Sequence, residues 1–278
     1  MKWLVFFVLW SVSISAFAID VIDDTGQKIF LKKPATRIIS LAPDLTENLF
    51  AIGAGDSIVG VIQGSDYPEG AKKIPVVGSV IGVDEEKILA LHPDLILVWD
   101  ESHLGDRLKK LGVPIFFSHP KKIADIASLL NRLGKLTGHE KKAEAVSALF
   151  LKKNELLIKK YAGQKTFSVY YEVWSQPFIT ITKQSWINDA IEICGGKNIF
   201  ADLKGVSPEI NVEAVLYANP DVIISSEKKQ DWKDFWKKWP ELKAVQQNHL
   251  HAVDADLLER ATPRVLEGMQ EMCLALRK

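Results

Sequence analysis

Two stretches of matching sequence each place one glutamate at the same distance from a Pro-Asp pair. They span residues 86–94 and 213–221, and Glu86 and Glu213 each lie seven residues before the proline. Because proline cannot continue a helix, each stretch predicts a short helix that ends before a buried strand. The helix dipole favours a carboxylate near such a helix start, which is one reason for each glutamate. The duplication supports another reason: two matched charges on one face, where a partner with paired arginines could dock.

No residue set in the sequence matches a common catalytic or phosphate-binding motif. There is no Gly-x-Ser-x-Gly elbow, no Walker A loop and no His-Glu-x-x-His helix. His249 and His251 would share one face of a strand, but a metal site usually needs more ligands, which favours a structural role. Tyr67 is a candidate ligand for a haem iron, although a tyrosine before proline is also common in turns. We therefore predict no metal, no cofactor and no catalytic residue.

Two other sets of side chains suit a binding site. Asp66 and Arg260 are the polar residues expected at a cleft, with an ordinary surface or interlobe salt bridge as the alternative. Trp232, Trp236 and Trp239 recur at helical spacing, which favours a stripe in the core or capping a lobe over a platform for a ligand.

A long polar helix is predicted over residues 141–161, between the two glutamate stretches. It contains no Gly or Pro and is rich in Ala, Leu, Lys and Glu, which are strong helix formers. Val146, Phe150, Leu157 and Tyr161 fall on one stripe at helical spacing. At 1.5 Å per residue such a helix is about 30 Å long. Matched halves with a stiff helix between them suggest two lobes and a cleft.

Apolar runs on both sides of this helix alternate with helical segments. Short runs rich in Val and Ile, bounded by Gly, Pro or Asp, are typical of buried strands. Alternation of strand and helix predicts mostly parallel sheets. We therefore predict an α/β fold of two Rossmann-like lobes joined by a single long helix, with a ligand cleft between the lobes. The predicted boundaries are 19–120 for the N-terminal lobe, 121–162 for the helical segment and 163–278 for the C-terminal lobe.

The individual elements follow from the same signals. Predicted strands are 37–41, 58–62, 74–77, 94–99, 114–117, 167–173, 178–182, 221–225 and 250–253, after a short extension, 20–34, with a turn at 24–26. Predicted helices, besides the long one, are 45–52, 85–91, 104–111, 123–136, 186–193, 212–218 and 263–276, the last with Thr262 as its N-cap.

Residues 1–18 predict a cleaved secretory signal peptide. A short positive start precedes an apolar run from Trp3 to Ile14, and small residues stand at the positions of a cleavage site. A membrane anchor is the alternative, but about 12 strongly apolar residues are too few to span a bilayer. The chain has 35 basic and 35 acidic residues, so no overall charge attracts it to nucleic acid or an anionic membrane.

Cys194 and Cys273 are the two cysteines of the chain. In an oxidising compartment an even pair predicts a disulfide, and two buried free thiols are the alternative. The bond would close a loop of about 80 residues, which the chain-entropy treatment values at roughly 4 kcal/mol.

Several motifs resemble one family of binding proteins. They are Arg37-Ile-Ile-Ser-Leu-Ala-Pro with Thr46-Glu47, Ser65-Asp66-Tyr67-Pro68, the two glutamate stretches, Cys194-Gly-Gly-Lys-Asn-Ile-Phe200 and Glu259-Arg-Ala-Thr-Pro-Arg264. The chain resembles periplasmic substrate-binding proteins of ABC importers whose lobes are joined by one rigid helix. Within that class it resembles the vitamin B12 (cobalamin) binding proteins. The resemblance covers residues 37–278.

The resemblance implies roles for individual residues. Glu86 and Glu213 stand where the family has two glutamates that meet arginines of the inner-membrane permease, and Cys194 and Cys273 stand where it has its disulfide. The implied protein is a periplasmic monomer that binds cobalamin or another corrinoid and no nucleic acid. Haem or a ferric siderophore is the runner-up ligand, and an exported α/β enzyme, which would need a converging nucleophile, base and orienting group, is the remote alternative. The predicted ligand-binding residues are Gly64, Asp66, Trp99, Trp174, Asp256, Leu257, Leu258, Glu259 and Arg260.

The chain departs from the family at several aromatic positions of the cleft. Gly64, Val80, Ser207 and Leu257 stand where the cobalamin-binding proteins have aromatic residues. Trp99 is kept, and Trp174 is a candidate for a new aromatic face from the C-terminal lobe.

Overall fold

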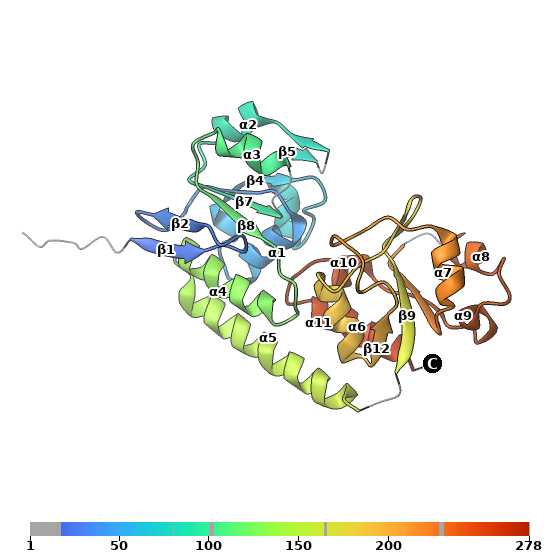
Figure 1. Cartoon of the computed structure of the whole chain (residues 1–278). Coiled ribbons are helices and arrows are strands. Elements are labelled where there is room, and N and C mark those ends of the chain that lie inside the picture. The colour runs from blue at the N-terminus through green and yellow to red at the C-terminus, as the bar shows by residue number, and fades with distance from the viewer. Residues whose placement is uncertain (1–17, 80, 100–102, 164–165, 228–230, 278) are drawn as a thin grey trace, which may run out of the picture.

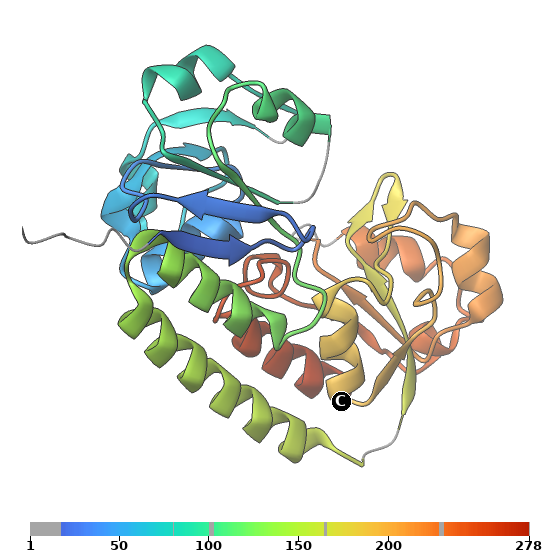
Figure 2. The same ribbon diagram turned by 60° about the vertical axis from the view of Figure 1, so that its left-hand side comes forward.

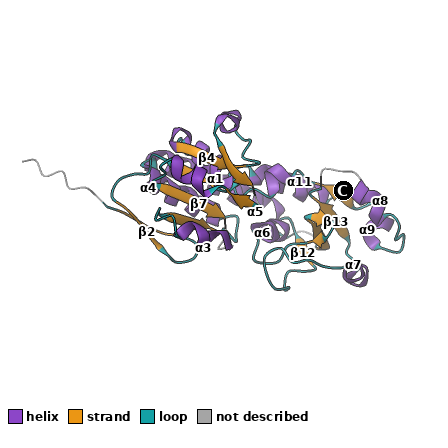
Figure 3. Cartoon of the chain, turned by 90° about the horizontal axis from the view of Figure 1, so that it is seen from above, coloured by secondary structure: helices purple, strands orange, loops and turns teal. Residues whose placement is uncertain are grey.

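The structure of the chain is a computed structural model that describes residues 18–79, 81–99, 103–163, 166–227 and 231–277 (Figure 1). The predicted signal peptide, apart from Ala18, and Val80 lie outside the described residues. Two α/β lobes lie at the two ends of an elongated molecule, as the view from above shows (Figure 3). No helix in the described part of the chain combines the length and the apolar character needed to cross a membrane.

A six-stranded sheet forms the core of the N-terminal lobe, in the order β6-β5-β4-β3-β7-β8. Every neighbouring pair is parallel except β5 and β6, so the predicted parallel sheet is confirmed. The strands are β3 (Ile38–Ser40), β4 (Ile58–Ile62), β5 (Val76–Ser79), β6 (Gly82–Val83), β7 (Leu95–Trp99) and β8 (Ile115–Ser118), and the helices are α1 (Pro43–Ala51), α2 (Glu85–Ala90) and α3 (His103–Lys109), with short 3-10 turns at Gly55–Ser57 and Glu69–Lys73.

Successive residues of a strand point to opposite sides of a sheet, and both faces of this sheet are covered by a core. Leu95 and Leu97 belong to the core on the side of α1 and α4 (Asp125–Thr137), whereas Ile96 and Val98 belong to a second core with residues of α2 and α3. A hairpin of β1 (Ile19–Ile22) and β2 (Lys28–Leu31) extends the lobe, and its turn is held by the Asp23 carboxylate, which accepts hydrogen bonds from the backbone N–H groups of Thr25 and Gln27 at 2.9 Å each.

The C-terminal lobe repeats this arrangement around a four-stranded parallel sheet in the order β12-β9-β13-β14. Tyr170 and Ile223 pack with Trp232 and Trp236 on one face, so the predicted tryptophan core is confirmed. Trp239 packs against the same cluster, although α8 ends before it. The elements are β9 (Phe167–Glu172), β12 (Gly196–Asn198), β13 (Val222–Ser225) and β14 (Leu250–Ala252), a hairpin of β10 (Trp174–Ser175) and β11 (Phe178–Ile179), and the helices α6 (Trp186–Ile193), α7 (Val212–Ala218), α8 (Asp231–Trp236), α9 (Lys243–Gln246) and α10 (Ala255–Leu258).

The long helix α5 (Glu140–Tyr161) connects the two lobes and packs beside α4 along the outside of the molecule (Figure 2). It begins one residue before the predicted start. Phe150 and Tyr161 are buried on the predicted stripe, and Val146 and Leu157 are partly buried. The guanidinium of Arg277 lies 4.1 Å from the centre of the Tyr161 ring, so the end of the chain covers the end of the long helix.

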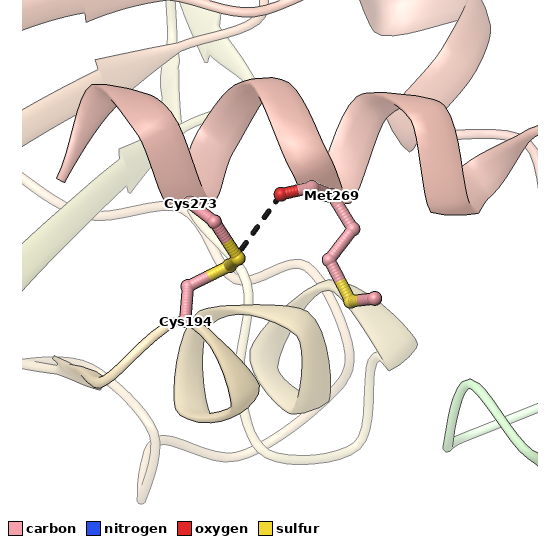
Figure 4. Close-up of a disulfide and its surroundings, with 3 residues drawn as sticks. All are labelled: Cys194, Met269 and Cys273. Carbon is pink, nitrogen blue, oxygen red and sulfur yellow. Dashed lines mark hydrogen bonds between the residues drawn. A yellow bond between two sulfur atoms is a disulfide. The ribbon is translucent and has the colours of Figure 1, made fainter. Parts of the chain in front are cut away.

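The last helix, α11 (Val265–Ala275), starts two residues later than predicted. Pro263 and Arg264 form a turn before it, and the Thr262 hydroxyl accepts a hydrogen bond from the Arg264 backbone N–H at 3.3 Å. Cys273 on this helix is bonded to Cys194 at the end of α6, which confirms the predicted disulfide (Figure 4). The bond joins residues 79 apart and holds the last helix against the C-terminal lobe.

Candidate functional site

Two adjoining cavities lie between the lobes and share Trp99, Trp186 and Glu259 as wall residues. The larger has a volume of about 400 Å³ and the smaller about 160 Å³. We call the two together the interlobe cleft. The larger cavity is also lined by Leu41, Ala42, Pro43, Asp44, Ile62, Ser79 and Val98, and the smaller by Val173, Ile181, Ser185, Ile187, Val206 and Ser207.

The cleft lies outside the carboxyl ends of the parallel strands. Ligands of α/β proteins with open sheets generally bind in this position. Ile62, Ser79 and Trp99 are the last residues of β4, β5 and β7, and Leu41 follows β3 directly. In the other lobe, Val173 follows the end of β9. The sheet order therefore brings together residues that lie far apart in the sequence.

Two indoles form the main aromatic surface of the cleft. Trp99, a predicted ligand-binding residue, stacks on His119 with 5.7 Å between the ring centres. Trp186 is 6% exposed, and its indole N–H donates to the Leu258 carbonyl oxygen at 2.9 Å. Trp186 was expected only as the first residue of a helix. The N-cap Ser185 directly before Trp186 marks the start of α6, and it was the sequence signal available at this position.

Glu259 is a carboxyl group of the C-terminal lobe that lines both cavities. The hydroxyl of Ser226 donates to its Oε1 atom, and the Tyr171 hydroxyl lies 3.4 Å from the same oxygen. Burial raises the pKa of Glu259 above its ordinary value, and the nearby Asp256 acts in the same direction, while the two hydroxyl donors oppose the rise. The predicted residue thus contributes a partly desolvated carboxyl to the cleft.

Asp44 is a second carboxyl group in the wall of the larger cavity, and it comes from the N-terminal lobe. Its side chain is buried, with the residue 6% exposed. Burial raises its pKa to about 6, and the negative charge of Glu47 adds to that rise, while backbone N–H groups at the start of α1 and the charge of Arg260 oppose it. Asp44 was not among the predicted site residues, although a charged residue directly after Leu41-Ala42-Pro43 at a strand end was a usable signal.

The predicted residues Asp66, Asp256 and Arg260 lie together beside the cleft as a cluster of ion pairs. Arg260 Nη1 is 2.9 Å from Asp66 Oδ1, and its Nη2 is 2.9 Å from Asp256 Oδ1. The Gly64 carbonyl oxygen is 3.4 Å from the same Nη2. The alternative that Asp66 and Arg260 form an interlobe salt bridge is therefore confirmed, and neither side chain lines the two cavities.

A second polar contact joins the lobes more deeply. Glu47 on α1 is buried and accepts hydrogen bonds from Arg264 Nε at 2.8 Å and from the Thr262 hydroxyl at 2.7 Å. The Asn48 side chain donates to the Ala261 carbonyl oxygen at 2.9 Å. These bonds fix the loop after α10 to the first helix of the other lobe.

Other predicted positions lie away from the cavity walls. Trp174 is 52% exposed on β10, and its indole N–H donates to the Gln176 carbonyl oxygen at 2.8 Å. Leu258, another predicted ligand-binding residue, has its side chain fully buried in the core. Leu257 is partly buried against Gly268 of α11. The Tyr67 ring is covered by the Arg264 guanidinium, 3.7 Å from the ring centre.

His249 and His251 keep their structural interpretation. Their ring centres are 6.1 Å apart, and the His249 ring meets the edge of Phe167. Within the described residues, no group of three or more His, Cys, Asp or Glu side chains is placed to hold a metal ion.

The two glutamate stretches fold alike. Glu86 and Glu213 are each the second residue of a short helix, α2 and α7, whose first turn is capped by the side chain of Asp84 or Asn211. Both glutamates are exposed. Over the described ranges of the chain, neither carboxylate forms an ion pair or a hydrogen bond with another residue.

The Pro-Asp pairs after these helices also play matching roles. The Asp94 carboxylate accepts a hydrogen bond from the Arg37 backbone N–H at 2.9 Å, and the Asp221 carboxylate accepts one from the Ser168 backbone N–H at 2.8 Å. Each aspartate therefore anchors the start of the neighbouring strand, β3 or β9. The repeated sequence thus places the two exposed glutamates at equivalent positions of the two lobes.

Comparison with known proteins identifies the family. A sequence profile described as periplasmic binding protein matches residues 38–257. The chain belongs to this family. Similar curated proteins include the vitamin B12-binding proteins of Vibrio cholerae, 35% identical over 88% of this chain and 90% of the relative, and of Yersinia pestis, 36% identical over 86% and 85%.

Solved structures share the fold of this chain. The periplasmic vitamin B12 binding protein BtuF of Vibrio cholerae is 35% identical, with a TM-score of 0.82 over 88% of this chain and 97% of that protein. The heme-binding protein HmuT has a TM-score of 0.76 over 94% of this chain and 90% of that protein at 19% identity, which shows the fold alone. The predicted α/β architecture of two lobes is therefore confirmed.

Proposed function

We propose that the protein is the periplasmic ligand-binding component of an ABC importer. It binds cobalamin or a related corrinoid in the interlobe cleft and delivers it to a permease in the inner membrane. The observation that carries the proposal is the cleft itself, in which both lobes supply walls and two indoles, Trp99 and Trp186, supply aromatic surface. A large, flat and mostly apolar ring is held by such contacts.

The relatives support this choice of ligand. The curated proteins at 31–36% identity named above and from Vibrio parahaemolyticus are vitamin B12-binding proteins by name, and the match covers at least 85% of each. The haem-binding structures share only the fold at about one fifth identity. In the described part of the chain, no Lys, Arg or His side chain lines the cleft to pair with the carboxylates of a haem.

Glu86 and Glu213 are the proposed docking residues for the permease. Both are exposed, both stand at the same position of a matched helix, and each belongs to a different lobe. A partner that presents two arginines at a fixed separation would contact Glu86 and Glu213, and therefore both lobes, at the same time. The unbroken helix α5 and the hydrogen bonds of Glu47 to Arg264 and Thr262 support small lobe adjustments rather than wide opening.

The ligand is tested by titrating the purified protein separately with cyanocobalamin, haemin and a ferric siderophore while following tryptophan fluorescence. We expect cyanocobalamin to quench the tryptophan fluorescence saturably, because Trp99 and Trp186 line the cleft. No response to cyanocobalamin together with a saturable response to haemin or the siderophore would overturn the choice of ligand. Turnover of an ester or phosphate substrate, abolished by changing one cleft residue, would instead support an enzyme.

A further inference from the structure

The Asp44 carboxyl group is poorly satisfied for a buried charge. Its Oδ2 atom is shielded from solvent and has no hydrogen-bond partner among the residues that the structure describes. Buried polar atoms are normally hydrogen-bonded, because leaving one unpaired forfeits its hydration without replacement. The residue nevertheless lines the larger cavity, as do Pro43 and Trp99.

Charged neighbours do not supply the missing partner. Glu47 on the same helix repels a negative charge at Asp44. Arg260 attracts it, but the guanidinium of Arg260 is held by Asp66 and Asp256 at 2.9 Å each. Glu259 reaches the same cavity from the other lobe and is a further carboxyl group. Among the described residues, the wall of the larger cavity therefore contains two carboxyl side chains and no cationic side chain.

We propose that Asp44 contacts the ligand and selects it, with its carboxylate accepting a hydrogen bond from an N–H or O–H group that the ligand extends into the larger cavity. This inference rests on the proposed function and refines the class of ligand. A corrinoid fits, because its ring carries neutral carboxamide groups with N–H donors. A haem does not fit, because its charged edge carries carboxylates that Asp44 and Glu259 would repel.

Selection of this kind depends on a buried acceptor that a wrong ligand leaves unpaired. A site built to hydrogen-bond a donor discriminates strongly against analogues without the donor. The charged form of Asp44 is the better acceptor, so a donor from the ligand favours ionisation. Because burial raises the pKa of Asp44 to about 6, affinity should be highest above that pH and fall as the pH drops through it.

The test is isothermal titration of the full mature protein with cyanocobalamin at about pH 7.5 and about pH 5. Asp44→Asn keeps the shape and removes the charge, and Asp44→Leu removes the acceptor. We expect Asp44→Leu to weaken binding at least ~10-fold at the higher pH. We expect Asp44→Asn to remove much of the pH dependence near 6. Asp125→Asn is the matched control, because Asp125 also lies in the first turn of a helix but outside both cavities.

The outcomes separate the inference from the proposed function. Wild-type protein that binds cyanocobalamin, with both Asp44 variants folded and showing unchanged affinity and pH dependence, would overturn the role of Asp44 and leave the function standing. Wild-type protein that fails to bind cyanocobalamin at either pH would overturn the proposed function and, with it, this inference. If Asp44→Leu does not fold, the pH profile of Asp44→Asn alone decides.

Discussion

Arg260 of the C-terminal lobe and Asp66 of the N-terminal lobe form an ion pair between the lobes, with 2.9 Å between Nη1 and Oδ1. The Arg260 side chain is 12% exposed and that of Asp66 is 55% exposed. The aspartate is therefore largely hydrated, so this pair is a weak fastening between the lobes. The pairing of Glu47 with Arg264 is deeper, because the Glu47 side chain is only 3% exposed.

This difference predicts unequal losses of stability. Asp66→Asn should lower the free energy of unfolding by less than about 1 kcal/mol, as exposed ion pairs contribute little. Arg264→Ala should lower it by roughly 3 kcal/mol or more, because Glu47 would keep a buried charge without its main partner. Urea unfolding followed by circular dichroism measures both. Equal losses in the two variants would mean that the lobes are not fastened chiefly at Glu47.

Removal of the disulfide should destabilise the protein without changing the cleft. A double variant, Cys194→Ser with Cys273→Ser, opens a loop closed by residues 79 apart. The expected loss is about 4 kcal/mol, because the unfolded chain regains the freedom that the bond removes. Thermal unfolding with and without a reductant is the measurement. A wild-type melting temperature insensitive to complete reduction would contradict this expectation.

Asp44→Asn should stabilise the fold at neutral pH. The pKa of Asp44 rises from 3.8 to about 6 on folding, so its charged form is disfavoured in the native state. The resulting loss of folding stability is absent at a pH below the pKa of Asp44 in the unfolded chain. It grows as the pH rises from about 4 to about 6 and stays constant at higher pH. A shift of this size corresponds to at most ~3 kcal/mol.

Melting temperatures of the wild type and the variant across this pH range check the sign. The variant should be the more stable protein at about pH 7.5, and the two should converge near pH 4. A variant that is less stable at every pH would show that Asp44 has a satisfying partner in the native state. Gain of stability with loss of ligand affinity is the pattern expected of a binding residue.

Charge reversal at the proposed docking residues should abolish transport and leave ligand binding intact. Glu86→Lys with Glu213→Lys would place two positive charges opposite the arginines proposed for the permease and would repel them. Uptake of labelled cobalamin through the cognate permease and titration of the purified variant are measured side by side. Glu155→Lys, an exposed change on α5, is the control. Lost ligand affinity in the double variant would place the glutamates in the binding site instead.

Much of the fold follows from local sequence signals. The predicted ranges of α6 and α7 agree with the structure to the residue, because an N-cap or a proline marks their limits. The strand β12 was missed because Gly196-Lys197-Asn198 has no apolar pattern, and it forms only by pairing with β9. The start of α11 was placed too early because the turn after Thr262 resembles a helix start.

The cleft was harder to predict, because its walls are assembled by tertiary contacts. Trp99 was found through the resemblance to a family, whereas Trp186 and Asp44 needed the two sheets to be in place. The contact between Glu47 and Arg264 joins residues 217 positions apart, and no local pattern encodes such a pair. The predicted residues in α10 and directly after it accordingly divide, with Leu258 in the core and Glu259 in the cleft wall.

Titration of the wild-type protein with cyanocobalamin, beside a Trp99→Ala variant, tests the central claim most directly. We expect saturable binding of one ligand per chain and an affinity lowered at least ~10-fold in the variant, because an aromatic wall of the cleft is lost. No binding of cyanocobalamin by the wild type, or equal binding by both proteins, would contradict it.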